Sequence, residues 1–308
     1  MKRVFGNHPQ CAVVPEYRFP IDPDGLVDFM CWNDAAWSPY AFDVRLKRLE
    51  RLLNDIGRNV FIRRVAANLL RETGLERLFP VHVLPAYSLI GFRRCSPSFH
   101  ELTRNLIQEL REFRYDGQWT GMRFGERRRL SYASKEHLLN LTRILGGYWQ
   151  AVIAEVCGVQ DAAYFLDDNT WNILFFDKIL KLVPYAKIVH VIRDPRDVVA
   201  SYRTMRWAPT KVSEAALWYK GIMQRWLAVK AQCPEDSYME VRLHEVVEHP
   251  DFQLRCIAKF WGVPWDESLK KESLGKSHTG RWKRDFDEKE RFELDSLLRD
   301  EIELLGYT

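Results

Sequence analysis

Apolar and polar residues recur along this chain with two periods, one typical of helices and the other of strands. Apolar side chains three or four positions apart predict amphipathic helices in several segments. These segments are residues 42–53, 60–71, 99–113, 134–156, 172–182, 195–205, 213–231, 251–261 and 287–305. Short apolar runs at 163–166, 187–193 and 237–243 predict strands. Strands that alternate with helices predict an α/β fold with a doubly wound, mostly parallel sheet flanked by helices.

Two stretches follow neither period. Residues 1–30 are rich in Pro, Asp and Gly, which excludes a long helix there. Residues 114–129 (RYDGQWTGMRFGERRR) are rich in Gly and Arg, and we expect a surface loop or lid. At 308 residues the chain is long for one domain but lies within the range of large α/β folds. We therefore expect a single domain over residues 1–308.

Composition excludes several classes of protein. The chain is 46% hydrophobic, enough for a substantial core, and its net charge of +4 comes from 46 basic and 42 acidic residues. This balance does not suggest a nucleic-acid binder, which would carry a concentrated basic face. The six cysteines form no C-x-x-C pair, so we expect no metal and no disulfide framework but reduced thiols in a cytoplasmic protein. No apolar stretch approaches the ~20 residues that span a bilayer, and the first ten residues (MKRVFGNHPQ) contain no hydrophobic signal region.

The segment 187–202 (KIVHVIRDPRDVVASY) carries the most chemical information. Its apolar run predicts a buried parallel strand, followed at once by a helix. Asp194 is a good N-cap, and Pro195 suits the first helical position. Free N–H groups and the positive end of the helix dipole would then favour a bound phosphate. Arg193 at the end of the strand and Ser201 on the helix could converge on it.

This segment resembles the sulfotransferases that use 3′-phosphoadenosine 5′-phosphosulfate (PAPS). A strand, a turn and a helix with a solvated Arg would explain part of the pattern, but not two arginines, an Asp-Pro cap and a Ser together. In that family a strand that ends in Arg-Asp-Pro-Arg-Asp, followed by a helix carrying Ser, binds the 3′-phosphate of the cofactor. The resemblance implies a P-loop NTPase-like fold, PAPS as the sulfuryl donor, and Arg193 and Ser201 as ligands of the 3′-phosphate.

A second segment, residues 276–283 (KSHTGRWK), resembles the late Gly-x-Trp-Lys element of the same family. That element wraps the 3′-phosphate and adenosine with backbone amides and a basic residue. The resemblance implies that Gly280, Arg281, Trp282 and Lys283 bind the cofactor. Gly280 would allow a close approach of the backbone. Taken without the family, the segment is equally well explained as a basic loop before the last helix.

Two further stretches bear on catalysis. Residues 6–19 (GNHPQCAVVPEYRF) resemble the family's His-Pro stretch that runs into a Pro-Glu pair, which makes Glu16 the candidate general base. His8 is a weaker candidate, and a loop carboxylate exposed to water is the alternative for Glu16. Residues 165–180 align with a stretch that normally reads Lys-Thr-Pro-x-Asn. Here Asn169 replaces the Lys and Trp171 the Pro, so one expected cation is missing.

The family's Gly- and Ser/Thr-rich loop for the 5′-phosphosulfate should precede His8 by about ten residues, yet His8 is seven residues from Met1. The first strand of the sheet and this loop are therefore expected to be absent. An internal Met taken as the start, a natural relic that binds nucleotide without catalysis, or a substitute loop would each explain this, and we favour the first.

The sequence thus predicts a PAPS-dependent sulfotransferase that transfers a sulfuryl group to a hydroxyl or amine. The alternative is a catalytically silent nucleotide-binding or interaction protein derived from the same fold. Small molecules, carbohydrates, lipids and peptides all remain open as acceptors, and no metal is expected. The sequence does not set the oligomeric state.

Overall fold

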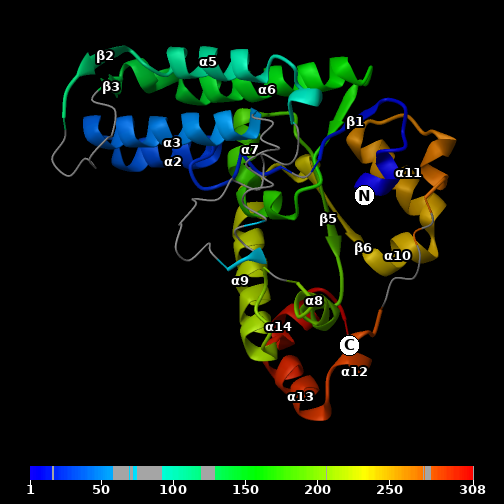
Figure 1. The fold of residues 1–308 in the computed structure, drawn as a ribbon. Helices are drawn as coiled ribbons and strands as arrows, with labels where there is room; N and C mark the ends of the chain where they lie inside the picture. The colour runs from blue at the N-terminus through cyan, green and yellow to red at the C-terminus, as the bar shows by residue number, and fades with distance from the viewer. Residues whose placement is uncertain are drawn as a thin grey trace. The chain divides into compact units, whose positions relative to one another are not determined.

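The computed structural model describes residues 1–15, 17–57, 69, 72–74, 92–118, 129–205, 207–272, 274 and 279–307 (Figure 1). These residues form two compact units. The first comprises Met1–Thr170 and Lys178–Pro184, and the second comprises Trp171–Asp177 and Tyr185–Thr308. The expectation of a single domain over residues 1–308 remains a prediction, and each unit is described on its own below.

The first unit is built mainly of helices. They are α1 (Lys2–Phe5), α2 (Leu26–Ala36), α3 (Pro39–Gly57), α5 (Phe99–Glu109) and α6 (Leu141–Val159). Helices α2, α3, α5 and α6 lie side by side, as Figure 1 shows: α3 contacts α2 and α5, while α6 contacts α5 and α2. On α3 the buried Leu46, Leu49 and Leu53 recur every three or four positions, which gives the helix one apolar face for its neighbours.

An aromatic cluster fills part of the core of the first unit. The Tyr17 and Phe19 rings stack with centroids 5.0 Å apart, and the Phe92 and Phe99 rings meet edge to face at the same distance. All of these side chains are at most 2% exposed. Edge-to-face and stacked pairs add to the free energy gained from burial of apolar area. This cluster therefore joins the Pro-rich N-terminal stretch to the start of α5.

Two strand pairs belong to the first unit. Strand β1 (Cys11–Val13) pairs in parallel with β4 (Tyr164–Leu166). Strand β2 (Phe113–Asp116) pairs with β3 (Arg129–Tyr132) in an antiparallel arrangement. The expectation of a surface loop over residues 114–129 is wrong at both ends, because residues 114–116 belong to β2 and Arg129 begins β3. The Phe113 and Tyr132 rings stack across the pair with centroids 4.8 Å apart. Residues 119–128 lie outside the described part of the chain.

The second unit contains a parallel pair of longer strands with helices around it. Strand β5 (Ile188–Ile192) pairs with β6 (Tyr238–Arg242), and His190 lies opposite Glu240 in the register. The helices are α8 (Pro195–Tyr202), α9 (Val212–Lys230), α10 (Leu243–Glu248), α11 (Pro250–Trp261), α12 (Trp282–Asp285), α13 (Glu288–Leu297) and α14 (Arg299–Leu304). Helix α8 contacts α9 and α12, and α9 contacts α13. Helix α7 (Phe176–Leu182) contains the boundary between the units.

The α/β class predicted from the sequence is confirmed, because helices surround two parallel strand pairs. The strands at 163–166, 187–193 and 237–243 are found within a residue or two of their expected ends. The expected last helix, 287–305, is divided at Leu298, and helix α2 was not expected. The expected helix 60–71 lies outside the described residues except for position 69. Among the described helices, none has the length and apolarity needed to cross a membrane.

A half-buried carboxylate, that of Glu240, ties the two strands of the second unit to helix α9. Glu240 accepts hydrogen bonds from His190 Nδ1 at 3.2 Å and from Trp226 Nε1 at 3.0 Å, and it also pairs with Lys230. The hydrogen bond from His190 lowers the pKa of Glu240 to about 2, with help from Lys230 and Trp226 and against burial, which raises it. The ionised form of Glu240 is therefore the form that stabilises the fold.

This network predicts a loss of stability in acid. An unfolded Glu titrates near 4.5 and the folded one near 2, so the stabilisation is present above about pH 4.5 and is lost as the pH falls through the folded pKa. Relative to Glu240→Gln, the wild-type free energy of unfolding should fall by up to ~3 kcal/mol on acidification. Urea denaturation at pH 7, 5 and 3 measures it. A difference between the two proteins that does not change with pH would contradict the assignment.

Candidate functional site

The junction between β5 and α8 is set by local sequence. The strand ends at Ile192, and Arg193 follows it directly. The Asp194 carboxylate then caps the helix by accepting the Arg196 backbone N–H at 2.9 Å, and Pro195 occupies the first helical position. An acidic N-cap before Pro is a strong start signal for a helix, because both satisfy or remove N–H groups that would lack partners. The sequence therefore places Arg193 at a fixed corner.

The Asp194 cap alters the anion site that was expected at the start of α8. The sequence predicted that free N–H groups at the start of α8 would face a phosphate. The Arg196 amide instead donates to Asp194, and the Asp194 side chain is 7% exposed. An amide that already serves a buried carboxylate offers little to a second anion. Any anion at this corner must therefore rely on side chains more than on that amide.

The buried carboxylate of Asp197 connects α8 to the segment at 280–283. Its Oδ2 accepts the Gly280 backbone N–H at 2.9 Å, and its Oδ1 accepts the Trp282 backbone N–H at 3.0 Å. The side chain is 0% exposed. Gly280 has φ of +77°, a backbone conformation that other L-residues adopt only with strain. Two segments more than 80 positions apart in the sequence are thereby brought together.

Arg193 shares this carboxylate. Its Nε lies 3.8 Å from Asp197 Oδ2, and its side chain is 19% exposed. Ser201 is four residues beyond Asp197 on α8, which places it on the same face of the helix about one turn further on. Of the residues predicted from the sequence, Arg193 and Gly280 therefore lie close together through Asp197. Ser201 lies on the same side of α8.

Arg196 holds the segment from a second direction. Its guanidinium binds both oxygens of Asp194, at 3.0 and 2.8 Å, and Asp295 Oδ1 at 3.1 Å. It also lies over the Trp282 ring, 4.1 Å from the centroid, and Trp282 is 7% exposed. Burial lowers the pKa of Arg196, but the hydrogen bonds and charges of Asp194 and Asp295 outweigh it and raise the pKa. Arg196 is thus a structural cation that fixes Trp282.

The two remaining cations of the segment differ in their surroundings. Arg281 forms an ion pair with Asp285, and its hydrogen bond lowers the pKa of that carboxyl. Lys283 is exposed, with Nζ 5.5 Å from the Trp282 ring centroid. Arg291 donates to the backbone carbonyls of Lys283 and Phe286, which secures the end of α12. Lys283 is therefore better placed than Arg281 to meet an anion from solvent.

Comparison with known proteins identifies the chain. A family model described as the sulfotransferase family matches residues 87–267, which is more than half of the chain. The chain belongs to the sulfotransferase family. The matched residues include β5, Arg193 and α8. They end before Gly280, so the placement of the 280–283 segment in this sulfotransferase-family chain rests on the contacts described above.

Individual relatives are more distant. The chain is 30% identical over 98 residues to a protein-tyrosine sulfotransferase from Drosophila melanogaster, an alignment that covers 30% of this chain and only 19% of the fly protein. Among solved structures, a sulfotransferase domain from the curacin biosynthetic pathway is 14% identical, with a TM-score of 0.43 and coverage of 70% and 77% of the two chains. A sulfotransferase domain from the Synechococcus PCC 7002 olefin synthase is 15% identical, with a TM-score of 0.38 and coverage of 56% and 70%.

The structure gives a different outcome for each of the other residues that the sequence of this sulfotransferase-family chain singled out. Glu16, the candidate base, lies outside the described residues and stays a prediction. His8 is 4% exposed, and its Nδ1 accepts the Gln10 backbone N–H at 3.1 Å, which is a structural role. Asn169, which stands where the family usually has Lys, donates to the Tyr17 carbonyl at 3.3 Å and is 7% exposed. The missing cation is therefore replaced by a packing residue.

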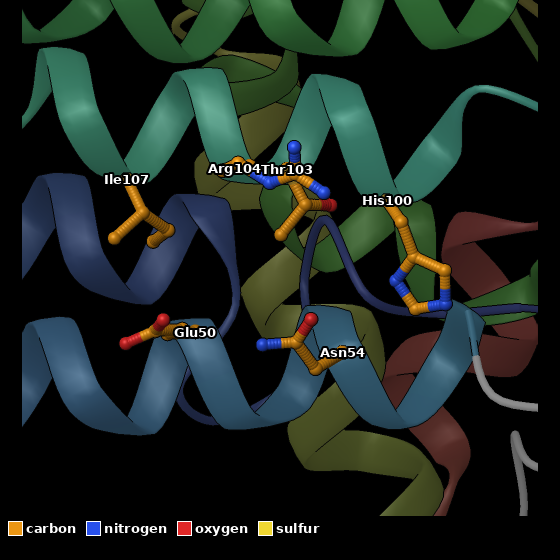
Figure 2. Close-up of a pocket in the computed structure, with 6 residues that line it drawn as sticks. All are labelled: Glu50, Asn54, His100, Thr103, Arg104 and Ile107. Carbon is orange, nitrogen blue, oxygen red and sulfur yellow. The ribbon is translucent and has the colours of Figure 1, made fainter.

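A pocket of about 230 Å³ lies elsewhere, between α3 and α5 in the first unit (Figure 2). Its lining residues are Glu50, Asn54, His100, Thr103, Arg104 and Ile107. None of them was predicted from the sequence to bind PAPS or to act in catalysis. The lining contains both an acidic and basic side chains, so it presents no single charge to an anionic ligand.

Sequence reasoning assigned no role to Asp197 or Arg196, although both belong to the quoted Arg-Asp-Pro-Arg-Asp run. The spacing of Asp197 from Arg193 gave no sure signal, because Arg193 precedes the N-cap Asp194 and lies outside α8. No sequence pattern predicts that the backbone amides of Gly280 and Trp282 donate to Asp197. Only the folded chain reveals these contacts.

The contacts of Arg196 predict that replacement by lysine lowers the stability of the protein even though the positive charge is kept. In Arg196→Lys the charge remains, but an ammonium cannot bind both Asp194 oxygens and also lie flat over Trp282. The free energy of unfolding should fall by about 2 kcal/mol. Guanidinium denaturation at pH 7 measures the change. Arg299→Lys, at an exposed position of α14, is the matched control and should stay within about 0.5 kcal/mol of wild type. Equal stability of the two variants would contradict the role of Arg196.

Proposed function

We propose that this chain transfers a sulfuryl group from PAPS to a hydroxyl or amine acceptor. Family membership supports sulfuryl transfer in general, and the proposal adds the donor and the residues that recognise it. One observation carries it: the Arg193 guanidinium and the Gly280–Lys283 segment meet at a single buried carboxylate of Asp197. In the family this corner and this segment together hold the 3′-phosphate of the cofactor.

The chemistry of the available donors fits a phosphate. Arg193 presents a partly exposed guanidinium whose planar fork suits phosphate oxygens. Lys283 adds an exposed ammonium, which acts as a point charge. Ser201 carries a hydroxyl on the same face of α8. The proposal therefore assigns the 3′-phosphate to Arg193, Ser201 and Lys283, whereas Trp282, 7% exposed beneath the Arg196 guanidinium, supports the segment from inside the fold.

The proposed reaction moves one group and one proton. PAPS supplies the sulfuryl group when it is bound. The acceptor oxygen or nitrogen forms a bond to sulfur, and the bond from sulfur to the bridging phosphate oxygen breaks, which leaves adenosine 3′,5′-bisphosphate. The acceptor must lose its proton as it attacks, and a carboxylate within hydrogen-bond reach is a suitable base. Glu16 is proposed for that role.

The acceptor class follows from the reaction more than from a described pocket. A hydroxyl or an amine is required, and small molecules, carbohydrates, lipids and peptides all offer one. The relative from Drosophila melanogaster is named for protein tyrosine. A tyrosyl hydroxyl therefore belongs in any first set of acceptors, beside a simple phenol, an amine and a sugar alcohol.

Calorimetric titration with adenosine 3′,5′-bisphosphate tests the 3′-phosphate site directly. Wild-type protein should bind it, and Arg193→Ala should bind at least about tenfold more weakly, because a charge-assisted contact to phosphate is lost. Arg299→Ala, on the exposed side of α14, is the control and should bind as wild type does. Absence of heat with wild type, or equal affinity in Arg193→Ala, would contradict the assignment.

Transfer itself needs a separate measurement. Protein incubated with sulfur-labelled PAPS and each acceptor should release adenosine 3′,5′-bisphosphate and move the label to the acceptor. Glu16→Gln should reduce the turnover number by about a hundredfold or more and leave nucleotide affinity unchanged, since a general base contributes on that order. Nucleotide binding without transfer to any acceptor would instead favour the catalytically silent alternative.

A further inference from the structure

Asp197 is an unusual residue to find beside a predicted phosphate site. It is an acidic side chain, fully buried, one turn beyond the arginine that would meet the anion. A bare carboxylate there would repel a phosphate. Burial of an unpaired charge also costs several kcal/mol, so such groups are retained only with partners. The partners of Asp197 decide what it does.

Those partners account for both oxygens of the carboxylate. Oδ1 accepts the Trp282 amide at 3.0 Å, while Oδ2 accepts the Gly280 amide at 2.9 Å and lies 3.8 Å from Arg193 Nε. Hydrogen bonds from backbone N–H groups to an ionised carboxylate are among the stronger ones in proteins. The negative charge is thus compensated inside the fold.

The geometry also sets the direction of Arg193. A guanidinium carries its donors in a rigid planar fork. Asp197 Oδ2 lies 3.8 Å from Nε, an ion-pair distance longer than a hydrogen bond, so its charge draws the guanidinium of Arg193 toward this side of α8. The same carboxylate fixes the backbone on both sides of Arg281, and Gly280 adopts the φ of +77° that this approach needs.

We infer that Asp197 is the positioning residue for 3′-phosphate recognition, since it orients Arg193 and docks the Gly280–Lys283 segment on the same helix. This inference rests on the proposed function, because it concerns the site assigned to the 3′-phosphate. Asp197 does not touch the nucleotide. It acts through Arg193 and the docked segment.

Nucleotide selectivity separates this role from a general effect on folding. Adenosine 3′,5′-bisphosphate and adenosine 5′-monophosphate differ only in the 3′-phosphate. In Asp197→Asn, one carboxamide oxygen can still accept an N–H, but the new NH₂ group opposes the second amide and the charge facing Arg193 is lost. Affinity for the bisphosphate should fall about 10- to 100-fold, and affinity for the monophosphate by less than about threefold.

Asp43→Asn is the matched control. Asp43 is a second buried aspartate, 2% exposed, which accepts the Ser131 backbone N–H at 2.8 Å and pairs with Lys47 at 2.7 Å. It lies in the first unit, whereas Asp197 lies in the second. Loss of a buried carboxylate should destabilise both variants, as thermal unfolding will measure. Only Asp197→Asn should lose its selectivity for the 3′-phosphate.

Gly280→Ala keeps the inference testable if Asp197→Asn does not fold. A Cβ at position 280 meets no other atom within 4 Å, so the cost of the substitution is backbone strain at φ +77°. Both carboxylate and amides remain, but docking is weakened. Selectivity for the bisphosphate over the monophosphate should drop about three- to fivefold.

The outcomes separate this inference from the proposed function. If wild-type protein shows no preference for the bisphosphate, the proposed function fails and the role of Asp197 fails with it. If wild type prefers the bisphosphate but Asp197→Asn and Gly280→Ala keep the full preference, only the role of Asp197 is overturned. Equal losses for both nucleotides in Asp197→Asn would also overturn it, because a merely structural carboxylate would act that way.

Discussion

The need to compensate one buried negative charge organises the second unit of this protein. Asp197 has no contact with solvent, so its carboxylate must find donors within the fold. It finds them in the amides of Gly280 and Trp282 and in the neighbouring Arg193. Because a buried carboxylate needs donors close by, this requirement fixes the backbone of Gly280 and Trp282 against α8. The corner after β5 and the late basic segment become one structure.

Arg196 is a buried cation that holds the same segment by contacting the Trp282 ring. It is nearly as buried as Asp197, and it carries a positive charge that Asp194 and Asp295 balance. Its flat face then covers the Trp282 ring. The charged residues of the motif have different structural roles. Asp194 and Arg196 hold the start of α8 and the Trp282 ring. Asp197 holds the backbone of Gly280 and Trp282 and pairs with Arg193. All three charged side chains of the motif after Arg193 are buried and bonded within the fold, whereas Arg193 is 19% exposed and Lys283 is exposed.

A second carboxylate, on strand β6, is also held as an anion by partners within the fold. Glu240 is stabilised as an anion by a histidine on the neighbouring strand and by Trp226 and Lys230 on α9. Neither carboxylate lies in the general apolar core, and each joins elements distant in the sequence. Family membership extends over residues 87–267, so it covers Asp197 and Glu240 but not the Gly280 to Lys283 segment. The contacts of Asp197 are what tie that segment to the family's motif.

The sequence by itself determined those strands and helix starts that depend on interactions between residues close together in the chain. The apolar run at 187–193 and the Asp-Pro start of α8 follow from backbone and capping chemistry, which acts within a few residues. It did not predict β2 and β3, because a Gly- and Arg-rich stretch carries no alternation and the strands are stabilised by pairing with each other. It also gave no role to Asp197. Arg193 precedes the N-cap of α8, so its spacing of four residues from Asp197 does not by itself predict a contact. Whether Asp197 is exposed or buried, and which amides it accepts, depends on long-range approach of another segment, and only the tertiary structure decided that.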